Sequence, residues 1–254
     1  EVSPRADLPP RPPILCAGCM HRPVFYAIRK VFRDGIYPSD IGCYTLGLQL
    51  GAVDTTICMG ASITVGSGMV HAGEEREIVA TIGDSTFLHT GIQGLMNAVY
   101  NDARMTVVIL DNRTTAMTGH QPNPTTGLTA CGTPAVPVSL EAVCRACGVA
   151  FVETVNPYDM AALTAALKDA RERPGVKVII AKQFCVITAR RAGIRRGRYL
   201  VDPEPCTGCG ICIAFGCPAI ERHDEKAFIN ELCSGCSVCA QLCPAGAIRK
   251  EGAR

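Results

Sequence analysis

Eight of the sixteen cysteines of this 254-residue chain fall into two runs near its C-terminus. In each run three cysteines are spaced by two residues and a Cys-Pro pair follows, so the two runs form an internal repeat. Thiolates spaced in this way are typical ligands of [4Fe–4S] clusters, and in the bacterial ferredoxin arrangement the cysteine before proline binds the other cluster. We therefore expect two clusters that transfer electrons. Their predicted ligands are a first tail set (Cys206, Cys209, Cys212 and Cys243) and a second tail set (Cys217, Cys233, Cys236 and Cys239).

Two other roles for these cysteines fit the pattern less well. Zinc sites also use CxxC pairs, but zinc ribbons use isolated pairs, whereas triplets followed by Cys-Pro occur here twice. A disulfide framework is disfavoured because the N-terminal residues lack the apolar core of a secretion signal. One departure from the ferredoxin pattern is that four residues, not three, separate Cys212 from Cys217.

A second group of residues suited to chemistry occupies two turns upstream, Gly83-Asp84-Ser85 and Asp111-Asn112. Asp84 offers a carboxylate, Asn112 an amide oxygen and Thr114 a backbone carbonyl, and such oxygen ligands suit a Mg²⁺ ion that also binds phosphates. Gly83 would let a diphosphate approach the backbone closely. Each turn alone is an ordinary end to a strand. Together, with one predicted helix between them, they predict a metal–diphosphate site.

The elements that must position these turns alternate between strands and helices. Apolar runs predict strands at 77–82, 105–110, 149–153 and 176–181, and residues 40–46 are expected to form a short strand that runs into a turn. Helical periodicity predicts helices at 23–33, 61–71, 87–100, 140–147 and 160–173. Strands that are apolar along their whole length are typical of a parallel sheet with helices on both faces. The predicted fold class is α/β: a parallel-sheet domain with ligands beyond the carboxyl ends of its strands, followed by a small α+β ferredoxin-like domain.

Length and composition limit the remaining possibilities. The chain suits one ordinary domain and one small one, with 48% hydrophobic residues and a net charge of +2. No pattern suggests nucleic-acid binding, and no run of about 18 apolar residues could span a membrane. Unpaired thiols and oxygen-sensitive clusters favour a reducing, anaerobic cytoplasm. We expect a proline-rich linker at 1–13, a sheet domain at 14–189, a basic linker at 190–200 and the ferredoxin-like domain at 201–254.

The spacing of Gly83-Asp84-Ser85 and Asn112 resembles the GDG…NN motif of thiamine diphosphate enzymes, with Ser85 and Asp111 as departures. A narrower resemblance is carried by DIGCYTLG, ICMGASI, GDSTFLHTGIQGLMNAVYN and ILDNRTTAMTGHQPNP. These stretches are similar to the alpha subunits of indolepyruvate:ferredoxin oxidoreductases, within the 2-oxoacid:ferredoxin oxidoreductase family. The resemblance covers nearly the whole chain from Leu15 onward, and family members are longer at the N-terminus.

The resemblance implies oxidative decarboxylation of an arylpyruvate to an acyl-CoA and CO₂, with electrons passed through the clusters to ferredoxin. It implies thiamine diphosphate and Mg²⁺ as cofactors and coenzyme A as co-substrate. A catalytic Glu would come from a pyrimidine-binding domain on a partner subunit or in a missing N-terminal region, and a gamma-type (beta) subunit would complete a hetero-oligomer. Two alternatives stay open. One is the same chemistry on pyruvate, 2-oxoglutarate or a branched-chain 2-oxoacid, and the other is an electron-transfer subunit with a degenerate thiamine site.

The resemblance also assigns ligands to the cofactors. A third [4Fe–4S] cluster beside the thiamine would be held by an upstream set (Cys16, Cys19, Cys43 and Cys185). The residues expected at the cofactor are Gly42, Cys43, Gly83, Asp84, Ser85, Asn112, Thr114, Met117 and Thr118.

Three histidines are candidates for proton transfer near the thiamine. His21 and His89 are the predicted catalytic residues, and His120 is a further candidate, with a structural hydrogen-bonding role as the alternative for each. The four cysteines outside the three sets are expected to be packing residues. They are Cys58, Cys131, Cys144 and Cys147.

Overall fold

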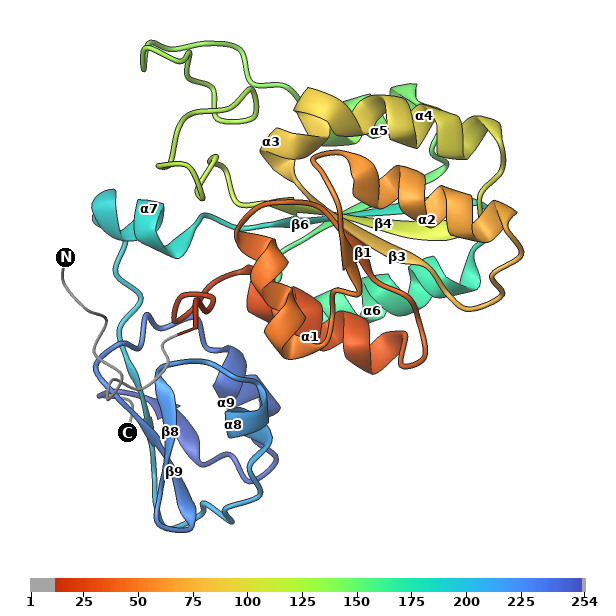
Figure 1. Ribbon diagram of the computed structural model, residues 1–254. Coiled ribbons are helices and arrows are strands. Elements are labelled where there is room, and N and C mark those ends of the chain that lie inside the picture. Colours follow the sequence, from red (N-terminus) through yellow and green to blue (C-terminus); the bar gives the residue numbers. More distant parts are fainter. Residues whose placement is uncertain (1–11, 253–254) are drawn as a thin grey trace, which may run out of the picture.

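Six parallel strands form the central sheet of the computed structural model, which describes residues 12–252 (Figure 1). The strands are β1 (Pro38–Ser39), β2 (Thr55–Thr56), β3 (Val79–Gly83), β4 (Met105–Asp111), β5 (Phe151–Val155) and β6 (Val176–Lys182). Their order across the sheet is β2-β1-β3-β4-β6-β5, and every neighbouring pair is parallel. The α/β fold class predicted from the sequence is confirmed.

Helices cover both faces of this sheet (Figure 1). One face carries α1 (His21–Val31) and α6 (Met160–Glu172), and the other carries α2 (Ala61–His71), α4 (Ile92–Tyr100) and α5 (Leu140–Ala146). Side chains of β4 alternate between the two cores: Val108 and Leu110 pack with α1 and α6, and Val107 and Ile109 pack on the opposite face. Both faces of the long strands are therefore buried, which explains why they are apolar throughout.

Side-chain caps fix where two of these helices begin. The Asp159 carboxylate accepts hydrogen bonds from the backbone N–H groups of Ala161 (3.1 Å) and Ala162 (3.0 Å), and α6 starts at the next residue. Ser139 accepts one from Ala142 (3.2 Å) at the start of α5. Such caps satisfy N–H groups that have no partner within the first helical turn.

Two segments near the polar turns differ from the sequence prediction. The short strand expected from residue 40 is wrong, because β1 ends at Ser39, and the turn expected after it is the start of a 3₁₀ helix, η1 (Cys43–Leu50). Thr45 Oγ1 accepts a hydrogen bond from Gly42 N (3.2 Å) and donates one to the Asp40 carbonyl (3.1 Å), which closes a turn there. The helix expected from 87 begins earlier. It runs through α3 (Asp84–Thr86), a π-helical turn η2 (Phe87–Gly91) and then α4.

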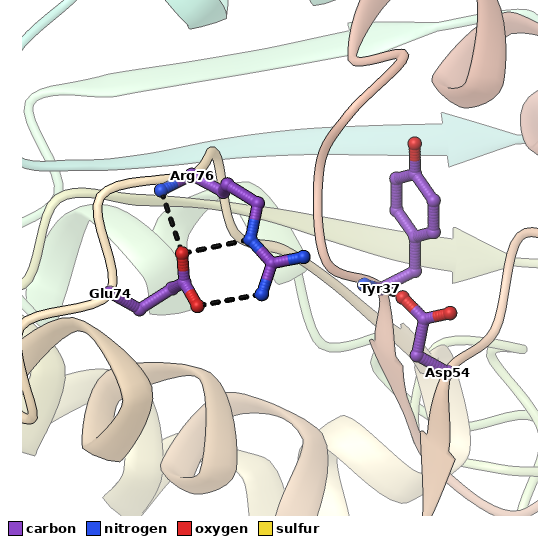
Figure 2. Close-up of polar contacts among 4 residues, drawn as sticks. All are labelled: Tyr37, Asp54, Glu74 and Arg76. Atoms are coloured by element: carbon purple, nitrogen blue, oxygen red, sulfur yellow. Dashed lines mark hydrogen bonds and ion pairs between the residues drawn. The ribbon is translucent and has the colours of Figure 1, made fainter.

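Two polar contacts lie at the end of the sheet opposite the polar turns (Figure 2). Before β3, the Glu74 carboxylate accepts hydrogen bonds from Arg76 N (3.1 Å), Nε (2.9 Å) and Nη2 (2.8 Å). Hydrogen bonding to the Arg76 side chain is the main reason that the pKa of Glu74 falls to about 2. Beside β1 and β2, Asp54 accepts a hydrogen bond from Tyr37 N (2.8 Å). The second contact joins the segments that lead into β1 and β2.

The C-terminal residues form a small α+β unit of two antiparallel strand pairs and two short helices (Figure 1). β7 (Tyr199–Val201) pairs with β10 (Ile248–Lys250), and β8 (Ile220–His223) pairs with β9 (Lys226–Ile229). The helices α8 (Ile211–Ala214) and α9 (Val238–Leu242) follow residues in left-handed conformation, Gly210 (φ 74°) and Ser237 (φ 67°). The same turn therefore recurs in both cysteine runs, directly after Cys209 and Cys236.

The sheet domain and the small unit share one hydrophobic core. Phe215, Val238 and Ile248 pack in the same cluster as the residues of α1 and α6. The segment that joins the two units contains the end of α7 (Val186–Arg191) and the start of β7, and we keep 190–200 as the proposed boundary. Residues 1–11 of the expected N-terminal linker lie outside the described residues. Within 12–252, no helix has the length and apolar character needed to cross a membrane.

The four cysteines expected to be packing residues divide into two pairs. Cys144 is a buried residue of α5, where burial raises its pKa to about 12, and Cys147 packs against the same core. Cys58 and Cys131 are exposed, so the packing role predicted for them is wrong. Both lie in irregular segments, where hydrophobic periodicity does not indicate which side chains are buried.

The core assignment predicts different costs for two adjacent substitutions in α4. Leu95 is fully buried, so Leu95→Ala should lower the free energy of unfolding by about 2–5 kcal/mol through lost packing and a residual cavity. Met96 is 49% exposed, and Met96→Ala should change it by less than about 1 kcal/mol. Urea unfolding followed by far-UV circular dichroism suits this tryptophan-free chain. Equal losses in the two variants would contradict the assigned core.

Candidate functional site

Each of the three predicted cysteine sets lines a cavity of its own. The first tail set surrounds a cavity beside α8 and β10. The second tail set surrounds another beside β8, β9 and α9. The upstream set lines a cavity of about 290 Å³ together with residues from the loop that follows β4. Each set includes cysteines from distant parts of the sequence, so only the folded chain brings its four sulfurs around one cavity.

Backbone N–H groups of the small unit favour thiolates in the first tail set. Ala247 N donates a hydrogen bond to Cys243 Sγ at 3.3 Å. Hydrogen bonds from the backbone of Ala227 and Gly208 lower the pKa of Cys206. The thiolate is the form that binds iron, so these contacts favour the ligand state.

Elsewhere the crowded sulfurs oppose their own ionisation. Burial is the main cause, and neighbouring thiolates add to it: the pKa of Cys236 rises to about 11 and that of Cys19 to about 12. Bound cations reverse this effect, because a coordinating metal deprotonates a thiol. Across residues 12–252, no three Cys, His, Asp or Glu side chains converge tightly enough for a single-ion site.

The predicted metal ligand Asp84 lies at the end of β3 and is only 2% exposed. Burial, followed by the adjacent Asp111 carboxylate, raises the pKa of Asp84 to about 7. Its Oδ2 accepts hydrogen bonds from Arg113 N and Asn123 Nδ2 (both 3.1 Å), and its Oδ1 accepts one from Ser85 N (2.7 Å). Two buried neighbouring carboxylates require a shared proton or a cation. The residues therefore fit a divalent metal at this edge of the sheet.

Asn112 and Thr114 form a buried turn beside this carboxylate pair. Asn112 Oδ1 accepts a hydrogen bond from Thr114 N at 3.0 Å, and the intervening Arg113 has a left-handed backbone with φ 61°. The Asn112 carbonyl accepts a hydrogen bond from Cys185 N at 2.9 Å. One turn thus contacts Asp84 through Arg113 N and the upstream set through Cys185, and Asn112 itself lines the cavity of that set.

The aromatic ring of Tyr44 fills the space beside Gly83. A Cβ atom at Gly83 would lie 2.6 Å from a carbon of this ring, and one at Gly42 would lie 2.4 Å from it. Tyr44 Oη is within hydrogen-bond distance of the Ile41 carbonyl (3.0 Å) and of Thr86 Oγ1 (3.2 Å). Packing against Tyr44 therefore also requires a glycine at position 83.

The three candidate histidines have different environments. His21 is 2% exposed, its Nδ1 lies 3.5 Å from Cys19 Sγ, and burial lowers its pKa to about 4. His120 lines the same cavity as the upstream set, and burial lowers its pKa as well. Both are therefore neutral near pH 7. His89 is exposed in η2 and is not among the residues that line this cavity.

The loop after β4 holds the remaining predicted residues. Met117 lines the upstream cavity and is 50% exposed. Thr118 donates a hydrogen bond to Gln121 Oε1 at 2.7 Å, within the loop itself. Thr115 Oγ1 donates to Ser85 Oγ at 2.9 Å, so the loop is attached to the GDS turn.

Sequence reasoning did not single out Asn123 and Tyr44. Asn123 contacts Asp84 from 39 positions along the chain, and its only signal is an amide side chain in a polar loop. The signal for Tyr44 is an aromatic residue directly after Gly42 and Cys43 in the expected turn.

The family model "Thiamine pyrophosphate enzyme, C-terminal TPP binding domain" matches residues 40–181, which include both polar turns. The chain belongs to the thiamine pyrophosphate enzymes. A second model, "4Fe-4S binding domain", matches residues 227–249 of this thiamine pyrophosphate enzyme, which contain the second cysteine run.

Two archaeal relatives make the placement narrower. Indolepyruvate oxidoreductase subunit IorA of Archaeoglobus fulgidus is 51% identical to this thiamine pyrophosphate enzyme over 253 residues, 96% of the chain and 40% of the relative. The same subunit of Pyrococcus horikoshii is 48% identical, over 96% of the chain and 41% of the relative. The resemblance seen in the sequence is confirmed, and the chain spans about two-fifths of the length of these relatives.

Solved structures share the fold, and one of them is a ferredoxin-linked oxidoreductase. It is described as 2-oxoglutarate:ferredoxin oxidoreductase from Magnetococcus marinus with 2-oxoglutarate, coenzyme A and succinyl-CoA bound. The TM-score is 0.62 at 20% identity, and the match covers 69% of this thiamine pyrophosphate enzyme and 65% of that chain.

The packing of Tyr44 predicts that Gly83→Ala weakens thiamine diphosphate binding. The added methyl group would overlap the Tyr44 ring and must push it aside. We therefore expect the affinity for thiamine diphosphate to fall by about tenfold or more, which is about 1.4 kcal/mol. Gly68→Ala in α2 is the matched control, because nothing lies within 4 Å of its added Cβ. Calorimetric titration of the full-length protein measures both. Unchanged affinity in Gly83→Ala would contradict this role of the glycine.

Proposed function

We propose that this chain is the part of a 2-oxoacid:ferredoxin oxidoreductase that binds thiamine diphosphate and carries its [4Fe–4S] clusters. The observation that supports this most directly is the turn at Asn112, which contacts both the Asp84 site and the upstream cysteines. A thiamine site and a cluster site that share one turn suit a reaction in which a bound substrate gives up electrons nearby.

In the proposed enzyme, thiamine diphosphate supplies decarboxylation chemistry, and the protein supplies binding and orientation. Asp84, Asn112 and the Thr114 carbonyl would hold Mg²⁺, and Asp111 would add negative charge beside it. The neutral imidazoles of His21 and His120 would accept or donate protons at the cavity they share. His21 is held in place by its contact with Cys19 and by edge-to-face packing on Tyr44, with ring centroids 5.8 Å apart.

The arrangement of the cysteine sets supports a direction for the electrons. The upstream set lies closest to the proposed thiamine site, and its loop contacts the second tail set through Gly18 and Ser234. Cys239 of the second tail set interacts electrostatically with Cys212 of the first. Cys209 of the first tail set is exposed. We propose that electrons pass in this order and leave to ferredoxin from the first tail set.

We propose an arylpyruvate such as indolepyruvate as the substrate. The relatives named as indolepyruvate oxidoreductase subunits support this choice. Coenzyme A would accept the acyl group.

The proposed enzyme requires further protein. A pyrimidine-binding domain with a catalytic Glu, in another part of the polypeptide or on a partner, would complete the thiamine site. A second subunit of the gamma (beta) type would complete a hetero-oligomer. The length of the relatives, about two and a half times that of this chain, supports the first of these requirements.

Activity measurements test the proposed reaction. The assembled enzyme should reduce ferredoxin with indolepyruvate and coenzyme A faster than with pyruvate, 2-oxoglutarate or a branched-chain 2-oxoacid. Asp84→Asn should lower kcat by about a hundredfold or more, since an amide replaces the only charged Mg²⁺ ligand proposed. Cys131→Ser, at an exposed position outside the three sets, is the control. Preference for another 2-oxoacid would contradict the proposed arylpyruvate substrate. Full activity in Asp84→Asn would contradict the proposed Mg²⁺ site and support a pure electron-transfer role for this chain.

Iron and acid-labile sulfide per chain test the number of clusters. Three [4Fe–4S] clusters give about twelve irons, and two give about eight. Cys185→Ser should reduce the count by about four, because it removes one ligand of the upstream set, whereas Cys58→Ser should leave it unchanged. A wild-type count of about eight would restrict the clusters to the tail.

A further inference from the structure

Arg22 is a buried cation at the boundary between the sheet domain and the small unit. Its side chain belongs to α1 and the residue is 3% exposed. Nη1 donates a hydrogen bond to the Gly216 carbonyl at 2.6 Å, and Nη2 donates one to the Leu15 carbonyl at 2.7 Å. A guanidinium is the side chain suited to this fork, since it presents several donors in one plane and stays charged when buried.

The two carbonyls belong to different cysteine sets. Leu15 directly precedes Cys16 of the upstream set, and Gly216 directly precedes Cys217 of the second tail set. The thiol groups that interact electrostatically with Arg22 come from these same two sets: Cys217, Cys19, Cys16 and Cys236. The two hydrogen bonds and these four thiols place Arg22 between the ligand loops of the upstream set and the second tail set.

One donor of Arg22 has no partner within the protein. Among the described residues, Arg22 Nε is a buried polar atom without a hydrogen bond, and Ser234 Oγ at the same boundary is another. An unpaired buried donor costs about 1–3 kcal/mol. Such donors suit an acceptor outside the polypeptide, and the sulfur atoms of an iron–sulfur cluster accept hydrogen bonds.

Near Arg22 the loops that carry the two cysteine sets are in direct contact. Gly18 lies between Cys16 and Cys19 with φ 70°, and a Cβ there would be 1.7 Å from Ser234 Oγ and 3.7 Å from Cys236 Cβ. Tyr158 Oη also donates to the Gly18 carbonyl at 2.6 Å, and Gln241 Nε2 donates to the Tyr158 carbonyl at 2.7 Å. The loop of the upstream set is therefore fixed directly against the second tail set.

We propose that Arg22 is a positioning residue for electron transfer between the upstream cluster and the second tail cluster. It fixes the distance between their ligand loops through two carbonyls, and its charge stabilises the reduced state of both clusters. Because each reduced cluster carries more negative charge than its oxidised form, a buried cation beside it raises its reduction potential. This inference rests on the clusters proposed above.

Redox titration of the assembled, anaerobically purified enzyme, followed by electron paramagnetic resonance, tests this role. In Arg22→Gln the reduction potentials of the upstream cluster and the second tail cluster should become more negative. The ratio of reduced to oxidised cluster should change about tenfold, which is about 59 mV for a one-electron couple. The third potential, that of the first tail set, should stay constant and serves as an internal reference. Arg22→Lys keeps the charge and should retain most of the potential, but it should weaken the magnetic coupling between the two clusters because the fork is lost.

Arg29→Gln is the matched control. Arg29 lies two helical turns further along α1, is exposed, and donates a hydrogen bond to the Leu50 carbonyl at 3.0 Å. This variant should leave all three potentials unchanged. Unchanged potentials in Arg22→Gln with every cluster present would overturn the role of Arg22 and leave the proposed enzyme intact. A wild-type enzyme with only about eight irons would instead refute the upstream cluster, and the role of Arg22 with it.

Discussion

The confinement of many anionic groups inside a small protein volume is the constraint on which the rest of this structure depends. Twelve cysteines gather in three sets around small cavities, and Asp84 and Asp111 are buried side by side. Burial raises the pKa of Cys19, Cys236 and Asp84. Such groups are stable as ligands only when cations compensate them. The glycine turns, the backbone N–H donors and the buried Arg22 are all consistent with a framework built around bound metal.

The sequence predicted the parts of the structure that depend on local pattern. Apolar runs indicated the long strands, and the spacing of the cysteines indicated which thiols gather, because a loop with two residues between thiols can bend around one point. At 40–46 a turn was expected, but the short strand before it was wrong, because the hydrogen bonds of Thr45 with Asp40 and Gly42 make the turn begin directly after Ser39. Asn123 was missed because its contact with Asp84 depends on the path of a long loop. The contact of Arg22 with Gly216, 194 residues away, lies beyond any local pattern.

The position of the candidate site follows from the sheet. Parallel strands place Gly83 and Asp111 at one edge, with β3 and β4 directly paired, so two turns separated in sequence become neighbours. The helix that begins at Asp84 directs its first N–H groups toward the same edge, where they favour an anion. The π-helical turn that follows is a geometry often found at functional sites. The diphosphate-binding character is therefore a property of topology as much as of individual residues.

The absence of space for even a methyl group between Gly18 and Ser234 has a consequence for how such chains can be recombined. The cysteine runs of the ferredoxin-like tail lie close together in sequence, which is typical of an independent domain. Its contact surface, however, is shaped by the loop at Cys16–Cys19 and by Arg22, at the opposite end of the chain. A tail transplanted from a relative would need those N-terminal residues to be transplanted with it. The tail and the segment from Leu15 to Arg22 therefore have to be exchanged together in a designed chimera.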